Sequence, residues 1–346
     1  MNSGIGRRTV MGGLAIVGTG AALGGSALAQ SSFKGRQLVA QGFGGPTQDV
    51  IQKAVFDPLD QKLGCTSTQV PLQSAAAFAR MRAEASAPQI DMYQFSGGQE
   101  VLAAAEKLTA GLGNLSNWGD VPAKMKDANR QWVTFAIIAE GILYRTDKIT
   151  TPPKSYKDFL NPAYDGHIAL PTITNGYGTD FLVMLARTFG GGEKNIDPGF
   201  NALAKIAPHA TIFKAASEVP ALFAQGDVWI TPYDSTSAKR CKDAGLPVAF
   251  ASPEEGSPAS FCTTCIAAKS KNIDLAREAV NQFISVESQI AIAKAMQWAP
   301  TNQRVKLPED LAKQLPRPDQ LVTLDMKTMT EHRPQWTERW NREINH

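Results

Sequence analysis

Several segments of this chain place small polar side chains and glycines where an apolar run gives way to a helical pattern. The most prominent is LPTITNGYGTDFL, in which Thr172, Thr174, Asn175 and Tyr177 precede an apolar helical pattern. The first N–H groups of a helix have no partner within the helix, and the helix dipole is positive there. Such a junction can bind an anionic or electron-rich ligand group, or it can be a simple helix cap.

Three further junctions have the same composition. They supply these candidate residues: Gly44, Gly45 and Thr47 after the first expected strand, Ser96 and Gly97 after the third, and Tyr233 and Asp234 after the strand DVWIT. One such junction is typical of a cap. Because ligands of α/β proteins bind at the carboxyl ends of strands, four junctions together indicate one cleft lined by all of them.

Strand and helix patterns alternate along the chain, which predicts an α/β protein with mixed sheets. An amphipathic helix is expected over residues 46–64, and a long β-rich run over 131–146. Residues 248–268 predict two further strands, and residues 274–298 are helical in pattern. A chain of 346 residues is too long for one simple core and fits two lobes.

The N-terminal residues 1–29 are typical of an export signal. Arg7 and Arg8 precede an uncharged run that ends in Ala27-Leu28-Ala29, a small-x-small cleavage site. The paired arginines favour a twin-arginine signal, and a general secretory signal is the alternative. We therefore expect cleavage near Ala29 and a periplasmic protein.

Charge and cysteine content exclude several classes of protein. The chain has 35 Lys and Arg against 32 Asp and Glu, without a basic run, so nothing indicates nucleic-acid binding. Four cysteines, Cys65, Cys241, Cys262 and Cys265, are too few for a disulfide scaffold. The CTTC segment lies in an expected strand, where its spacing puts the two side chains on opposite faces. We therefore expect buried free thiols and no metal site.

No catalytic motif is present in the sequence. It contains no G-x-S-x-G, no H-E-x-x-H and no P-loop, and His167 and His209 have no partner at the level of sequence. These features predict a protein that is not an enzyme and needs no cofactor. An enzyme or a sensor subunit on the same fold stays an alternative.

The chain resembles a known family over almost its whole mature length. It is similar to the periplasmic solute-binding proteins of ABC importers, in the spermidine/putrescine, thiamine, iron and phosphonate group. The similar segments, in order, are GGPTQDVIQKAVFDPLDQKLG, APQIDMYQFSGG, ITTPPKSYKDFLNPAYDGHIALP, ALFAQGDVWITPY, DAGLPVAFASPEEGSPA, FISVESQIAIAKAM and APTNQRVKLPED.

The resemblance implies a two-lobed periplasmic-binding-protein fold of type II, with mixed sheets, helices on both faces, and a ligand cleft between the lobes that closes on the ligand. It implies a monomer whose partners are a small-molecule ligand and the permease subunits of an ABC transporter in the inner membrane. The expected division is residues 30–138 for the first part of lobe 1, 139–250 for lobe 2, 251–300 for the return to lobe 1, and 301–346 for a C-terminal helical segment packing on the lobes.

The resemblance narrows the ligand only in part. Polyamine-binding relatives carry a tryptophan and, two residues on, an aspartate, where this chain has Ser260 and Cys262. Iron-binding relatives use adjacent tyrosines, and none of the six tyrosines here is adjacent to another. Both departures weaken those assignments, and ferric iron is kept as an alternative.

The candidate residues favour a small polar organic solute that contains an amine: polyamine-like, aminophosphonate, opine-like or thiamine-like. Four aromatic residues could form walls that also suit a cation: Tyr177, Tyr233, Phe261 and Trp298. Asp234 is the candidate partner for the amine. The alternatives are a helix cap for Asp234, core packing for Phe261, and hinge packing for Trp298.

Overall fold

The computed structural model describes residues 1, 33–96, 98–312, 315 and 320–344. Beyond Met1, the export signal expected over residues 1–29 lies outside the described residues, as does the candidate Gly97. In the described part of the chain, no helix is long and apolar enough to cross a membrane.

The strands follow one path in the order β2-β1-β3-β10-β5-β8-β6-β7. The pairs β1–β2, β1–β3, β6–β7 and β6–β8 are parallel, whereas β10–β3, β10–β5 and β5–β8 are antiparallel, so the predicted mixed sheets are confirmed. The bounds are β1 Gln37–Gly42, β2 Thr66–Pro71, β3 Met92–Phe95, β5 Trp132–Arg145, β6 Ile168–Pro171, β7 Ala210–Phe213, β8 Ile230–Asp234 and β10 Ser257–Ala267.

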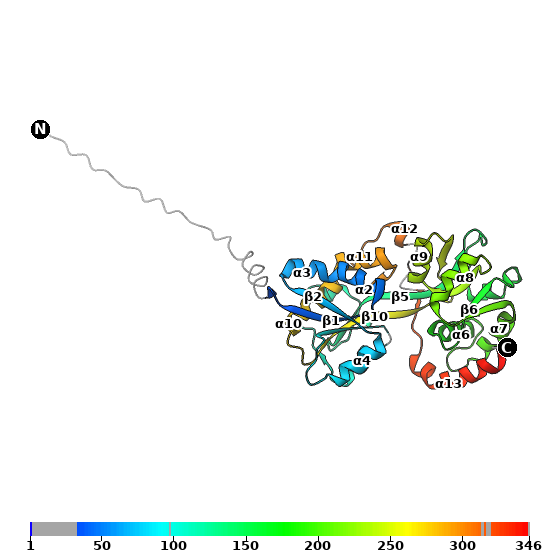
Figure 1. Cartoon of the computed structure of the whole chain (residues 1–346), viewed down its shortest axis with the longest axis horizontal. Coiled ribbons are helices and arrows are strands. Elements are labelled where there is room, and N and C mark those ends of the chain that lie inside the picture. The colour runs from blue at the N-terminus through cyan, green and yellow to red at the C-terminus, as the bar shows by residue number, and fades with distance from the viewer. Residues whose placement is uncertain (2–32, 97, 313–314, 316–319, 345–346) are drawn as a thin grey trace.

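Strands β5 and β10 connect two lobes (Figure 1). The first half of β5, up to Ala139, pairs with β10, and its second half, from Glu140 on, pairs with β8. The change of partner therefore falls between Ala139 and Glu140, and it brings Glu140 to the passage between the lobes. The lobe boundaries expected at 138/139 and 250/251 stay predictions.

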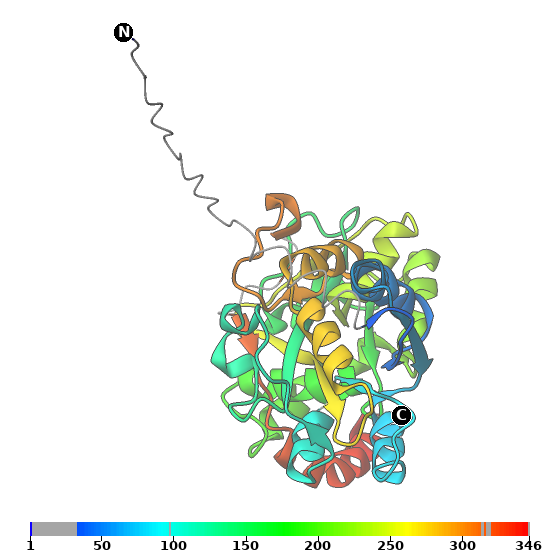
Figure 2. The ribbon, with the colours of Figure 1, turned by 90° about the vertical axis from the view of Figure 1, so that its left-hand side faces the viewer.

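Helices cover both faces of the sheet in each lobe. Their bounds are α2 Gly45–Ile51, α3 Asp57–Leu63, α4 Ser74–Ala83, α5 Gln99–Ala105, α6 Gly176–Thr188, α7 Asp197–Ile206, α8 Val219–Gln225, α9 Ser235–Asp243, α10 Ile273–Phe283, α11 Val286–Met296, α12 Glu309–Ala312 and α13 Met326–Glu343. Figure 2 looks onto the first lobe, with α10 (gold) in front of the strands. On α10, Leu275, Ala276, Ala279 and Phe283 are buried at helical spacing, as the sequence predicts.

The cysteines occupy the positions expected of core residues. All four are buried and free. Cys262 packs in the core cluster of α10 and α11, whereas Cys265 packs in the cluster of α4 and α5, on the opposite face of the sheet. The described residues contain no group of three or more His, Cys, Asp or Glu side chains arranged to hold a metal.

The C-terminal segment runs from the first lobe to the second. Its short strand β11, Ala299–Pro300, pairs with β5, and β12, Leu321–Val322, pairs with β10. Helix α13 then packs on the second lobe, where Met329, Trp336 and Trp340 join the core of α6 and α7 (Figure 1).

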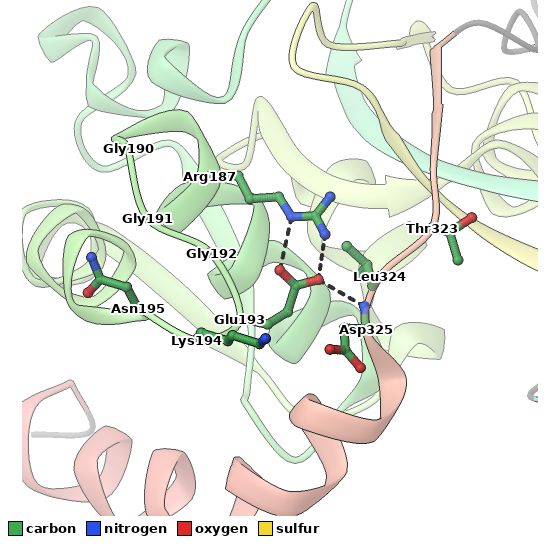
Figure 3. Close-up of a pocket in the computed structure, with 10 residues that line it drawn as sticks. All are labelled: Arg187, Gly190, Gly191, Gly192, Glu193, Lys194, Asn195, Thr323, Leu324 and Asp325. Atoms are coloured by element: carbon green, nitrogen blue, oxygen red, sulfur yellow. Dashed lines mark hydrogen bonds and ion pairs between the residues drawn. The ribbon is translucent and has the colours of Figure 1, made fainter.

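Glu193 anchors this segment to the second lobe (Figure 3). Its carboxylate accepts hydrogen bonds from Arg187, at 3.1 Å from Nε, and from the Asp325 N–H at 2.9 Å. These groups lie in a cavity of about 550 Å³, the larger of the two cavities beside residues 323–325. Since Arg187 and Glu193 are already paired with each other, we assign that cavity to the attachment of the segment and not to a ligand.

Candidate ligand-binding site

A second cavity, of about 210 Å³, lies between the lobes. Ser96, Gly98 and Glu100 line it from the first lobe, and Asp180 lines it from the second. The crossing strand β10 and the segment before α13 complete the wall with Pro258, Ala259, Ser260, Phe261, Thr323, Leu324 and Met326. A pocket formed by both lobes and by the strands that connect them fits a ligand that bridges the lobes.

Asp180 belongs to a cluster of three carboxyl groups on the second lobe. Glu140 on β5 stands opposite Asp234 on β8 in the antiparallel ladder, and Asp180 comes from the first turns of α6. Asp234 is 4% exposed and caps α9 by accepting the Ser237 N–H at 2.8 Å. The Tyr177 hydroxyl donates to the same carboxylate at 2.6 Å.

The carboxyl groups of Glu140 and Asp180 share a proton. Burial, the negative charge of Asp180 and a hydrogen bond to Asp180 raise the pKa of Glu140 well above its usual range, with Asp234 adding to the effect. Burial raises the pKa of Asp180 to about 6, although the hydrogen bond from Glu140 and the positive charge of Arg333 act to lower it. Two partly buried carboxyl groups in contact cannot both ionise cheaply, so Glu140 keeps the proton and donates it to Asp180.

Glu100 supplies a carboxyl group from the first lobe. It lies in the first turn of α5 and is only 5% exposed. Burial raises its pKa, while its own backbone N–H and the Thr263 side chain act in the opposite direction. Among the described residues, its Oε2 atom has no hydrogen-bond partner. The carboxyl groups of both lobes therefore favour a positively charged ligand group, which would relieve the cost of their burial.

Four of the predicted residues lie at the cavity or beside it. Ser96 and Phe261 line the cavity, and Tyr177 and Asp234 belong to the carboxyl cluster through their hydrogen bond. Tyr233 lies behind them, 2% exposed in a core cluster, with its ring centroid 5.6 Å from that of Tyr177. Asp234 combines the cap with a place in the cluster, so the two alternatives offered for it do not exclude each other.

The start of α6 is capped by its own sequence. The Asn175 side chain accepts the Tyr177 N–H at 3.2 Å, and its carbonyl accepts the N–H groups of Gly178 and Thr179 at 3.0 and 3.3 Å. These three N–H groups are therefore occupied in this structure. Thr174 is exposed, and Thr172 donates its N–H to the carbonyl of Phe213. An anion-binding role for this stretch stays a prediction, and the hydrogen bonds to Asn175 favour simple capping.

The other predicted residues lie away from the cavity lining. Trp298 is 3% exposed, packs in the core of the first lobe and donates its indole N–H to Thr236 Oγ1 at 2.7 Å. Because Thr236 belongs to the second lobe, this contact agrees with hinge packing. Gly44, Gly45 and Thr47 lie at the start of α2 and are not among the residues that line the cavity.

Three residues of the site are not predicted from the sequence: Glu100, Glu140 and Asp180. A signal for Glu140 exists, because it is the one charged residue in the apolar run VTFAIIAEGILY. A carboxylate in a central strand is costly to bury, and such residues are rarely found there unless they are paired. Glu100 and Asp180 each follow a strand-end cluster by a few residues, in the first turns of a helix, where acidic residues commonly serve the helix dipole.

Comparison with known proteins gives one match to a family and many similar folds. The model of the family "Bacterial extracellular solute-binding protein" matches residues 99–329, more than half of the chain. A search of curated proteins finds no match.

Solved structures agree with the chain in fold. An extracellular solute-binding protein of Bordetella parapertussis is 23% identical, with 89% of this chain and 98% of that chain covered and a TM-score of 0.80. The spermidine/putrescine ABC transporter substrate-binding protein PotD of Streptococcus pneumoniae is 17% identical, with coverages of 89% and 99% and a TM-score of 0.77. The periplasmic binding protein AgtB of A. tumefaciens R10, in complex with agropinic acid, is 19% identical, with coverages of 90% and 99% and a TM-score of 0.65. These matches confirm the predicted periplasmic-binding-protein fold.

Proposed function

Given that this chain belongs to the family of bacterial extracellular solute-binding proteins, we propose that it is the periplasmic substrate-binding component of an ABC importer for a small, amine-containing organic solute. The family confirms the expectation that the chain is not an enzyme. The importer and the class of solute are parts of the proposal.

One observation carries the class of solute. The cavity between the lobes is walled by Glu100 from one lobe and by Asp180, in contact with Glu140, from the other. A protonated amine between these groups would be attracted from both sides, because opposite charges within a few ångströms favour the charged state of each partner. Since the wall holds carboxyl groups from both lobes, the same attraction favours closure of the lobes.

The geometry supports a solute that turns a cationic group, and not an anionic group, toward the cavity wall. Among the described residues, those that line the cavity include no Lys, Arg or His. Three N–H groups at the start of α6, those of Tyr177, Gly178 and Thr179, already donate to Asn175. Among the expected solutes, a polyamine-like or thiamine-like amine is therefore better supported than an aminophosphonate or an opine-like acid. The names of PotD, with spermidine and putrescine, and of AgtB, with agropinic acid, agree with a small organic solute.

Native mass spectrometry of freshly purified protein tests this function. We expect a co-purified organic solute that carries a cationic nitrogen and is lost from the Asp180→Asn variant. Asp243→Asn is the matched control, because Asp243 is exposed and pairs with Lys239. A co-purified anion without an amine, or the same solute retained by Asp180→Asn, would contradict the proposal.

Export is a separate part of the proposal. We propose that residues 1–29 direct the chain to the periplasm, by the twin-arginine route, and are removed there. Intact-mass analysis of the periplasmic fraction should show a chain that begins near Gln30, and replacing Arg7 and Arg8 by lysine should keep the precursor in the cytoplasm. A periplasmic chain that begins at Met1 would rule out cleavage.

A further inference from the structure

Glu100 presents an unusual combination at the wall of the cavity. Its side chain is 95% removed from solvent, and its Oε2 atom has no hydrogen-bond partner among the described residues. A buried acceptor that lacks a partner costs on the order of 1–3 kcal/mol, so native structures rarely keep one without use.

The remainder of this carboxyl group is well supported. Burial raises the pKa of Glu100, whereas its own backbone N–H and the side chain of Thr263 on β10 act to lower it and so favour the charged form. The position of the side chain is fixed by the first turn of α5, which begins four residues after the end of β3. The side chain is thus held in place, with one oxygen left for a donor that none of the described residues provides.

We propose that Glu100 is the residue of the first lobe that receives an N–H group of the solute, so that the solute presents a protonated primary or secondary amine, an amidinium or a guanidinium and not a quaternary ammonium. This inference rests on the proposed function. A quaternary ammonium carries the right charge but no hydrogen to donate, and it would leave Oε2 without a partner.

The other side chains that line the cavity indicate the chemistry of the part of the solute beside its nitrogen. Apart from Ser96, Ser260, Thr323 and the two carboxyl groups, the side chains that line the cavity are apolar, with Phe261, Leu324 and Met326 as the largest. Met326 is 52% exposed, which is unusual for a large apolar side chain. A ligand bound in the cavity would cover it. A short apolar body beside the nitrogen is complementary to this wall.

Matched pairs of probes test the requirement for an N–H donor. Ethanolamine and choline differ only in methylation of the nitrogen, as do benzylamine and benzyltrimethylammonium. Isothermal titration and thermal shift at neutral pH should give at least about tenfold tighter binding of each amine over its trimethylated partner, as expected for a hydrogen bond to a charged group. Benzylamine should bind more tightly than ethanolamine because of its apolar body.

Variants connect this preference to Glu100. Glu100→Gln keeps the shape of the side chain but removes its charge, so it should lower amine affinity at least about tenfold without lowering the melting temperature of the empty protein. Glu106→Gln is the control, since Glu106 ends the same helix in an exposed pair with Arg82.

Three results would overturn the inference: trimethylated probes that bind as tightly as the amines, amine affinity unchanged in Glu100→Gln, or no binding of any of the four probes at millimolar concentration. A quaternary ammonium that co-purifies with the protein would likewise overturn it. That last result would leave the proposed transport function standing, so the two can fail separately.

Discussion

At the scale of the residue, the site is defined by carboxyl groups whose charge is costly. Glu140 donates the shared proton to Asp180, and Tyr177 donates to Asp234. Each of these hydrogen bonds compensates part of the cost of burial, and a bound cation would compensate more.

The raised pKa of Asp180 predicts a pH dependence of stability in the absence of ligand. Because its folded-state pKa of about 6 lies above the usual aspartate value of 3.8, the protonated form stabilises the fold. That contribution is complete below about pH 4 and is lost as the pH rises through 6, so it should amount to about 1–2 kcal/mol between these limits. Chemical unfolding of the wild type and of Asp180→Asn over this range measures it.

The comparison with Asp180→Asn separates this change in the free energy of unfolding from that of other titrating groups. The change belongs to the Glu140–Asp180 pair as a unit. Affinity for an amine should follow the opposite trend and weaken as the pH falls below 6, because protons compete with the cation. A free energy of unfolding with the same pH dependence in both proteins would contradict the shared proton.

Asn175 tests whether the start of α6 is a cap or a ligand site. Its side chain accepts the Tyr177 N–H, so Asn175→Ala should lower the free energy of unfolding by about 1 kcal/mol. Amine affinity should stay unchanged, because the residues that line the cavity do not include Asn175. Thermal melts without ligand and titrations with it separate the two readings. A loss of affinity without a loss of stability would restore the anion-site interpretation.

For individual residues, the sequence predicts only the part of the site that local patterns encode. Ser96 is predicted because it follows a strand end, where the ligands of α/β proteins bind, and Phe261 is predicted as an aromatic wall that suits a cation. Glu140 is missed because its run matches an ordinary core strand, and only the change of partner at Ala139 and Glu140 brings it to the cleft. Such a change depends on pairing between distant segments, which local patterns do not encode.

At the scale of the element, β5 and α6 together position the cluster. Strand β5 places Glu140 opposite Asp234, and the first turns of α6 place Tyr177 and Asp180 beside them. The positions of these elements follow well from their apolar patterns. Hinge packing of Trp298 is among the alternatives that the sequence offers, but its hydrogen-bond partner Thr236 is 62 residues away and cannot be predicted from a local pattern.

The close approach of α6 to its preceding loop predicts a contrast between two glycines. A Cβ atom on Gly178 would lie 2.2 Å from the Thr172 carbonyl oxygen, whereas one on Gly176 would meet nothing within 4 Å. Gly178→Ala should therefore lower the free energy of unfolding by about 1–3 kcal/mol. Gly176→Ala, the matched control, should change it by less than about 1 kcal/mol. Equal effects of the two substitutions in denaturant unfolding would contradict the packing of this helix start.

At the scale of the whole molecule, two lobes share β5, β10 and the C-terminal segment. The segment passes from β11 on the first lobe to α13 on the second, and Glu193 fixes it there through the Asp325 N–H. Because Thr323, Leu324 and Met326 of this segment line the cavity, a solute would contact both lobes and the segment that connects them. On the proposed function, we expect contacts on every side of the cavity to favour closure of the lobes on the solute.

A crystal structure of the protein with its co-purified solute tests the central claim most directly. We predict a solute in the cavity between the lobes, with a protonated nitrogen about 3 Å from a carboxylate oxygen of Asp180. A solute bound outside this cavity, or one that turns an anionic or uncharged group toward Asp180, would contradict it.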